Sequence, residues 1–134
     1  MGALAESSGI RAGLKYRTPI KTELETVLRI DPAFQQGSAD RALGRWYFKV
    51  PRLFGGDRKL SEQHLRASLR YDAASAASHF FLAELLRDEG QAQEARAELQ
   101  QVLDAPLDPD WAPEDQEFKV DARKMIAEMA RQYL

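Results

Sequence analysis

Two carboxylates one helical turn apart, Glu84 and Asp88, form the pair in this sequence that most resembles a catalytic acid and base. Such a pair can transfer protons when one group is held protonated and the other charged. No candidate nucleophile accompanies these residues, and acidic residues are far more common on the solvated side of a helix. We therefore expect no catalytic role for them and no enzymatic activity in the chain.

The two histidines and one glycine-rich segment are the other candidates for chemistry. Neither His64 nor His79 has a paired His, Asp or Glu at metal-ligand spacing, so ordinary surface or interface histidines are predicted. Residues 54–59, Phe-Gly-Gly-Asp-Arg-Lys, lack both the spacing of a phosphate-binding P-loop and a preceding strand. A bend between helices explains this segment better, and no cofactor or metal is expected.

The composition is that of one ordinary soluble domain. The chain has 134 residues, of which 44% are hydrophobic and 30% charged, which is enough to bury a single core. The absence of cysteine excludes disulfides and thiolate metal sites within these residues. A net charge of −2 argues against a nucleic-acid or anionic-membrane surface. The sequence contains no apolar run of about 18 residues, so no transmembrane segment is predicted.

The segment from Ser78 to Pro106 is patterned as two antiparallel helices. Its first half carries an apolar stripe with amphipathic helical spacing, formed by Phe81, Leu82, Leu85 and Leu86. A second stripe comprises Ala92, Ala95, Leu99, Val102 and Leu103. Gly90 lies between the stripes and suits a helix end, because glycine accepts the left-handed backbone of a C-cap. The pattern predicts a helical hairpin.

A similar apolar register occurs three times along the chain, which indicates an internal repeat. The matching positions of the three second helices are Ile20, Leu24, Val27 and Leu28; Ser61, Leu65, Ser68 and Leu69; and Ala95, Leu99, Val102 and Leu103. The third set follows the second by 34 residues, and the second follows the first by 41. Because each hairpin exposes an apolar face, we expect it to stack on its neighbour.

An insertion of five residues lengthens the second hairpin relative to the third. It falls within residues 50–57, Val-Pro-Arg-Leu-Phe-Gly-Gly-Asp. Pro51 is expected to end the preceding helix, and the glycine pair to permit a sharp reversal. Asp57 is expected to cap the helix that follows.

These hairpins resemble the tetratricopeptide repeat (TPR) family. Residues 43–47, Leu-Gly-Arg-Trp-Tyr, match the Leu-Gly-x-x-Tyr pattern of the family, and residues 82–86 occupy the same place in the third unit. The period of 34 residues is also that of the family. The resemblance implies an all-α, right-handed superhelix of antiparallel helix hairpins. Its units are expected at about 3–31, 32–72 and 73–106, followed by a C-terminal helix at about 113–133.

The C-terminal helix carries an apolar stripe with a spacing of about 3.6 residues. The stripe consists of Phe118, Ala122, Met125, Ile126, Met129 and Tyr133. We expect this helix to cap the end of the stack. A free face for a partner or for a second copy of the chain is the alternative.

The insertion is similar to that of short TPR proteins related to the T component of tripartite (TRAP-type) substrate uptake systems. The similarity lies in the Leu-Gly-x-x-Tyr segment followed by Pro-x-x-Phe-Gly-Gly-Asp, and in residues 105–110. It implies a periplasmic, often lipid-anchored protein that forms an oligomer and docks the substrate-binding subunit. Outside that family a cytoplasmic location would be expected. The chain has no anchor cysteine.

In TPR stacks the first helix of each hairpin lines the concave face, and positions beside the Leu-Gly-x-x-Tyr stripe contact the ligand. Carried onto this sequence, these positions are Arg41, Arg45, Phe48, Lys49, Phe80, Glu84, Arg87 and Asp88. The resemblance therefore implies a protein-interaction scaffold. Arg45 and Lys49 can hold an extended acidic peptide, and Phe48 or Phe80 can supply an apolar anchor. Simple solvation of the face is the alternative for each charged residue.

Two other functions stay open from the sequence. The stack or its oligomer can instead carry a small organic or lipid ligand in a channel lined by Phe48, Phe54 and Phe80. The chain can also be a domain of a larger regulatory protein. A scaffold should retain a protein, a peptide or a second copy of itself, whereas a carrier should retain a small molecule.

Overall fold

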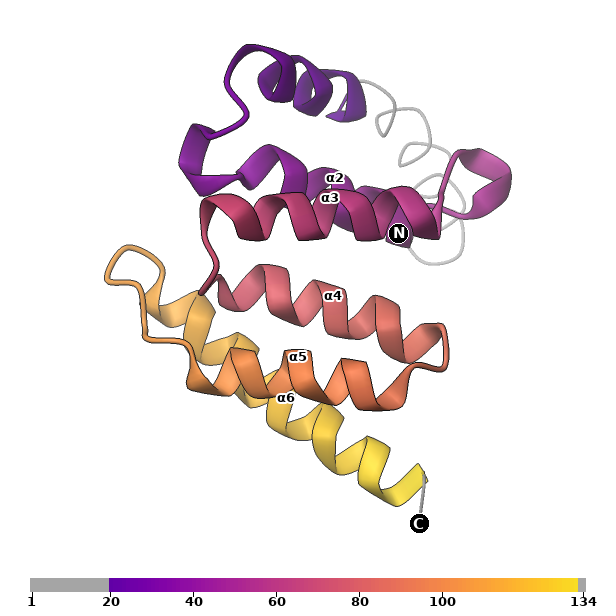
Figure 1. The fold of residues 1–134 in the computed structure, drawn as a ribbon, viewed down its shortest axis with the longest axis vertical. Coiled ribbons are helices and arrows are strands. Elements are labelled where there is room, and N and C mark those ends of the chain that lie inside the picture. The colour runs from indigo at the N-terminus through magenta and orange to yellow at the C-terminus, as the bar shows by residue number, and fades with distance from the viewer. Residues whose placement is uncertain (1–19, 133–134) are drawn as a thin grey trace, which may run out of the picture.

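Residues 20–132 are described by the computed structural model, and they form helices and no strand (Figure 1). A helix over residues 20–30 precedes the short 3-10 helix η1 (Phe34–Gln36). The longer helices that follow are α2 (Ser38–Lys49), α3 (Arg58–Tyr71), α4 (Ala76–Asp88), α5 (Ala92–Asp104) and α6 (Ala112–Gln132). A second 3-10 helix, η2 (Arg52–Phe54), lies between α2 and α3.

The predicted all-α class is confirmed for these residues. Two parts of the sequence-based prediction lie outside them. They are the beginning of the first predicted unit, within residues 1–19, and the end of the C-terminal stripe, Tyr133.

The connection between α2 and α3 follows the chemistry predicted for residues 50–57. Helix α2 ends just before Pro51, as expected. A Cβ on Gly56 would lie 1.7 Å from the Val50 carbonyl oxygen, so a side chain there would require the backbone to move. The Asp57 carboxylate accepts a 3.0 Å hydrogen bond from the Leu60 amide and caps α3. The reversal and the cap are therefore confirmed.

Helices α2 and α3 approach closely because Gly44 presents no side chain to α3. A Cβ at Gly44 would lie 2.6 Å from Cγ of Leu65, far inside the contact distance of two carbons. The Ser61 hydroxyl uses the same close approach and donates a 2.6 Å hydrogen bond to the Gly44 carbonyl. The packing of α2 on α3 therefore requires a residue without a side chain at this position.

Helices α4 and α5 form the predicted hairpin around Gly90, whose φ is 80°. Ser75 begins α4 by accepting a 3.1 Å hydrogen bond from the Ser78 amide. Leucines and valine from this hairpin dominate the core, where Leu82, Leu85, Leu86, Leu99 and Val102 are buried. Each buried leucine contributes roughly 1.5 to 3 kcal/mol to folding. This hairpin is therefore the centre of the fold.

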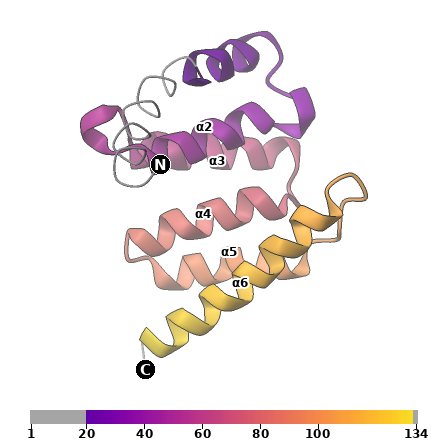
Figure 2. The same cartoon turned by 180° about the vertical axis from the view of Figure 1, so that it is seen from behind.

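The helices from residues 20–30 to α5 are stacked in chain order (Figure 1). Helix α2 packs on α3, α3 on α4, and α4 on α5. Helix α6 runs obliquely to this stack and contacts both α4 and α5 (Figure 2). Its residues Ala122 and Met129 are buried in the shared core. As a result, α2, α4 and α6 together border one side of the molecule.

Lys119 joins α6 to the end of α5. Its ammonium donates hydrogen bonds of 2.7, 2.8 and 2.6 Å to the carbonyl oxygens of Val102, Leu103 and Ala105. The last carbonyls of a helix have no partner within the helix, and a cation there also interacts favourably with the helix dipole. One side chain therefore caps α5 and positions α6.

We expect Lys119→Met to lower the free energy of unfolding by about 1 to 3 kcal/mol, because partly buried carbonyls would lose their donor. Chemical denaturation followed by circular dichroism measures the loss. Lys124→Met, at an exposed position of α6, is the matched control and should change the value by less than about 0.5 kcal/mol. Equal effects of the two substitutions would contradict the capping role.

Candidate functional site

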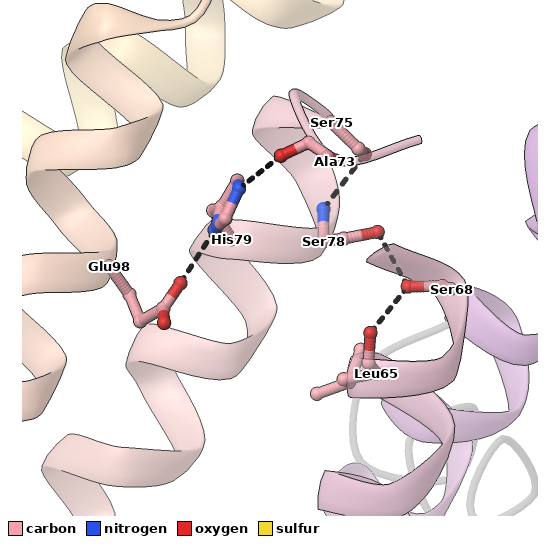
Figure 3. A network of polar contacts seen from close by, with 7 residues as sticks. All are labelled: Leu65, Ser68, Ala73, Ser75, Ser78, His79 and Glu98. Carbon is pink, nitrogen blue, oxygen red and sulfur yellow. Dashed lines mark hydrogen bonds and ion pairs between the residues drawn. The ribbon is translucent and has the colours of Figure 1, made fainter. Parts of the chain in front are cut away.

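Arg41 of α2 begins a polar network that crosses to α3 and α4. Its Nε donates to the Ser78 hydroxyl at 2.7 Å, and its Nη2 donates to the Gln36 carbonyl at 3.1 Å. The Ser78 and Ser68 hydroxyls are hydrogen-bonded at 2.9 Å, and Ser68 also donates to the Leu65 carbonyl at 2.6 Å (Figure 3). Both serines are fully buried. The network therefore holds the guanidinium in one position.

Arg41 borders a cleft of about 580 Å³ between the starts of α2, α4 and α6. The segment over residues 106–111 lines another side of it. The rings of Phe81, Trp111 and Phe118 contribute apolar walls, with the centroids of Phe81 and Phe118 5.5 Å apart. Trp111 is 52% exposed at the cleft. A concave, partly aromatic cleft of this size is typical of a ligand-binding site.

The charged groups around the cleft are mostly acidic. Arg41 is accompanied by four carboxylates, those of Asp72, Asp108, Glu114 and Asp115. Within residues 20–132, none of these four forms an ion pair. Burial lowers the pKa of the Arg41 guanidinium from its usual value, and the charges of Asp72 and Asp115 oppose that shift. Since arginine stays protonated in proteins, one positive group faces four acidic ones.

An ion pair between Arg45 of α2 and Glu84 of α4 lies beside the cleft. The Arg45 guanidinium also stacks over the ring of Phe81, 4.4 Å from its centroid. Phe81 lines the cleft, whereas Glu84 lines a second hollow further along the same helices. The ion pair therefore marks the boundary between the two.

The second hollow has a volume of about 440 Å³ and is mainly polar. Asp88 is paired with Arg58, and Arg87 is paired with Glu128 at 3.0 Å. Lys49 is exposed and forms no ion pair within the described part of the chain. The main lining residues are Phe48, Lys49, Glu84, Arg87, Asp88 and Met125.

The family model of the TRAP transporter T-component matches residues 12–130 of the sequence. The chain belongs to this family. The match includes nearly every residue that borders the cleft and the hollow. The resemblance inferred from the insertion is thereby confirmed at the level of the family. No TPR-specific family model matches, so the TPR assignment stays a prediction.

No curated protein and no solved structure matches this chain significantly. Among residues 20–132, no helix has the length and apolar character needed to cross a membrane.

Most residues predicted for recognition lie on the α2, α4 and α6 side of the T-component. Arg41 borders the cleft, and Arg45 lies between cleft and hollow. The hollow collects Phe48, Lys49, Glu84, Arg87 and Asp88. These placements bring the residues together, and their role in binding stays a prediction.

Phe80, which was predicted to be a possible apolar anchor, borders neither the cleft nor the hollow. Only 8% of the residue is exposed, and its ring packs 5.5 Å from that of Phe118. The neighbouring Phe81 lines the cleft instead. Two consecutive phenylalanines both fit the apolar pattern of a helix, so the sequence did not distinguish the buried ring from the one at the surface.

The three phenylalanines expected to line a carrier channel do not share one cavity. Phe80 is buried, Phe48 borders the hollow, and Phe54 is 50% exposed in η2. The carrier hypothesis therefore loses its expected lining.

The cleft itself was missed by sequence reasoning. Its aromatic walls come from α4, α6 and the segment before α6, and its carboxylates come from the end of α3 and from residues 108–115. The signal that was present is the run of acidic residues and prolines around the exposed Trp111. Residues 105–110 of that run contributed to the prediction only through the resemblance to the T component.

Glu84 and Asp88 each pair with an arginine of another helix, Arg45 and Arg58 respectively. The two carboxylates therefore form interhelical ion pairs. Both histidines also have carboxylate partners. His64 Nδ1 lies 2.8 Å from Asp40 Oδ1, and the partner of His79 is Glu98. Within residues 20–132, no cluster of three or more potential metal ligands occurs.

His79 is a buried contact between α4 and α5, not a surface group, with 7% of the residue exposed. Its Nδ1 lies 2.5 Å from Glu98 Oε2, and its Nε2 lies 2.8 Å from the Ala73 carbonyl oxygen (Figure 3). Burial lowers the pKa of His79, but the hydrogen bonds to Glu98 and Ala73 and the charges of Glu98 and Asp72 outweigh it. The net result is a pKa above the usual 6.5. Both ring nitrogens face acceptors, which suits the doubly protonated imidazolium.

The sign of this shift predicts how stability depends on pH. A pKa raised in the folded state means that protonation of His79 stabilises folding. This contribution is fully present below the unfolded pKa of about 6.5 and is lost as the pH rises through the higher folded-state pKa. Denaturation at a series of pH values should show this decline, and His79→Gln should remove it. A variant profile parallel to that of the unaltered chain would show that His79 is not the group responsible.

Proposed function

We propose that this T-component is a non-enzymatic docking subunit of a substrate uptake system, and that its α2, α4 and α6 side holds a segment of a partner protein. The observation that carries the proposal is that the same three helices border both the cleft and the hollow. Arg41 and Phe118 border the cleft, and Phe48 and Met125, each seven residues later, border the hollow. Seven residues span about 10 Å of helix. We call the cleft and the hollow together the groove.

The family supports a docking role, because a component of a transporter acts together with other proteins. The groove supports it physically. An elongated surface with aromatic walls at one end and paired charges along its length suits an extended polypeptide better than a compact small molecule. The Arg45–Glu84 pair lies in the middle of this surface.

We also propose that the hairpins are TPR-like. Residues 34 positions apart have equivalent environments in α3 and α5: Leu65 and Leu99 are both 0% exposed, as are Ser68 and Val102. This equivalence is expected when one repeat stacks on the next. It supports the proposal that the two hairpins are equivalent units stacked on one another.

Lys49 offers the sharpest test of docking, because its ammonium is exposed in the hollow and has no acidic partner among residues 20–132. Affinity capture from native extract, read by mass spectrometry, should recover one polypeptide with the unaltered chain. Lys49→Glu should weaken its retention about fivefold, as expected for reversing a charge at the edge of an interface.

Arg96→Glu is the matched control, because Arg96 is exposed on α5 and does not border the groove. It makes the same charge change and should leave retention unaltered. If Lys49→Glu and Arg96→Glu bind the polypeptide equally, the groove is not the docking surface. If the unaltered chain retains no polypeptide, the docking function itself is wrong.

A further inference from the structure

The cleft end of the groove combines apolar walls with an excess of unpaired negative charge. Its carboxylates come from three separate places, with Asp72 after α3, Asp108 in the connection before α6, and Glu114 and Asp115 in the first turn of α6. None of them is neutralised by an ion pair within residues 20–132. A concave surface with this charge attracts a cation and disfavours an anion.

Arg41 does not reverse this preference. Its guanidinium already donates to the Ser78 hydroxyl and the Gln36 carbonyl, and Asp72 and Asp115 are the acidic groups whose charges act on it. The remaining carboxylates, Asp108 and Glu114, add negative charge and have no ion-pair partner among residues 20–132. An acidic peptide segment is therefore poorly matched to this end of the groove.

The aromatic walls favour a particular kind of cation. Phe81, Trp111 and Phe118 line the cleft, and aromatic faces attract guanidinium and ammonium groups. Arg45 already shows this contact, since its guanidinium lies over Phe81. Leu107 and Trp111 are 42% and 52% exposed at the same cleft, so apolar surface is also available. An arginine or lysine side chain offers both a charged end and an apolar stem.

We propose that the cleft binds an arginine or lysine side chain of the partner segment, with an adjacent apolar residue packed on Trp111 and Leu107. This inference rests on the proposed docking function and adds the chemistry of the docked segment. The hollow at the other end presents the ammonium of Lys49, which has no ion-pair partner in the part of the chain that the structure describes. The two ends therefore differ in charge, and a segment with a basic residue at the cleft and an acidic residue near Lys49 can bind in only one direction.

Synthetic peptides test the proposal directly. The first probe is a fluorescein-labelled peptide, Gly-Ser-Leu-Arg-Leu-Ser-Gly, and the second has glutamate in place of its arginine. Fluorescence anisotropy should show at least about tenfold tighter binding of the arginine peptide, because the exchange replaces attraction by repulsion at several carboxylates. Equal binding of the two peptides would overturn the proposal.

Matched double variants locate the binding. Asp72→Asn with Glu114→Gln removes two charges from the cleft and should weaken binding of the arginine peptide roughly 3- to 30-fold. Glu117→Gln with Asp121→Asn removes two charges from exposed positions of α6 outside the cleft and should leave it unchanged. Thermal melts confirm that both variants fold. Equal weakening by both would mean that general charge, not the cleft, attracts the peptide.

Two further experiments distinguish failure of this inference from failure of the docking function on which it rests. Butylguanidinium is the free-cation probe, and if it competes as well as the arginine peptide, the cleft is a small-cation site and the polypeptide assignment is wrong. In the native-extract experiment, a partner that is retained equally by the unaltered chain and the cleft variant leaves docking intact and overturns the basic-residue inference. Loss of retention with the cleft variant alone supports both.

Discussion

Replacing Gly44 by leucine is expected to lower the free energy of unfolding by about 3 kcal/mol. The reason is that α2, which contains Gly44, cannot separate from α3 without opening the core. The first added carbon would already lie 2.6 Å from Cγ of Leu65 and 3.1 Å from the backbone carbonyl oxygen of Ser61. The Leu65 side chain is 0% exposed and lies in the core cluster, so any shift of it disturbs its packed neighbours. The Ser61 carbonyl belongs to α3, so relief requires the whole helix to shift.

Denaturant titration measures this effect, with Ala97→Leu on the exposed face of α5 as the control. Both substitutions add a large apolar side chain to a helix, but the control adds it in open solvent and should change stability by less than about 0.5 kcal/mol. Gly44→Ala should fall between them, because its clash is partly offset by the better helix propensity of alanine, worth about 1 kcal/mol. A Gly44→Leu variant as stable as the unaltered chain would mean that α2 and α3 are not in close contact at this point.

Features set by local chemistry were predictable from the sequence. The cap at Asp57 and the left-handed Gly90 depend only on neighbouring backbone groups. The burial of Leu65 and Leu99 was also predictable, because both residues lie on the apolar stripe of an amphipathic helix.

The charges of the candidate site were less predictable, because their partners are distant in the sequence. Arg45 was expected to be available to an acidic peptide, but Glu84, 39 residues away, neutralises it. Arg87 likewise meets Glu128 of α6, 41 residues away. Lys49, by contrast, forms no ion pair within residues 20–132. Identifying which cations stay available requires the packing of the helices, above all the oblique course of α6.

The acidic cleft was unpredictable for the same reason. It forms where the start of α6 comes close to the starts of α2 and α4, and the position of α6 depends on the Lys119 hydrogen bonds to the end of α5. A periodic stripe on α6 predicts that one face is buried, but not the direction in which the helix crosses its neighbours. The acidic peptide was predicted at Arg45 and Lys49, and neither of these residues borders the cleft.

Leu99→Ala is expected to cost about 2 to 5 kcal/mol, because it removes three carbons from a position that is completely buried. Leu99 lies in the core cluster that joins α3, α4, α5 and α6, so the cavity cannot collapse without disturbing several helices. Leu53→Ala is the control, because Leu53 is 86% exposed. This substitution makes the same chemical change at a position that faces solvent. A loss below about 1 kcal/mol for Leu99→Ala would contradict its assignment to the core.

The shape of the Leu99→Ala transition tests a further point. If the stack unfolds as one cooperative unit, the whole transition should move to lower denaturant with its slope unchanged. In repeat arrays, however, each unit contacts only its neighbours, and a weakened unit can unfold first. An additional transition at lower denaturant concentration would then reflect the unfolding of the α4–α5 hairpin and α6. Tryptophan emission distinguishes the two cases, because Trp111 precedes α6 whereas Trp46 lies in α2. Single-tryptophan variants should lose their signals together in the first case and in sequence, Trp111 before Trp46, in the second.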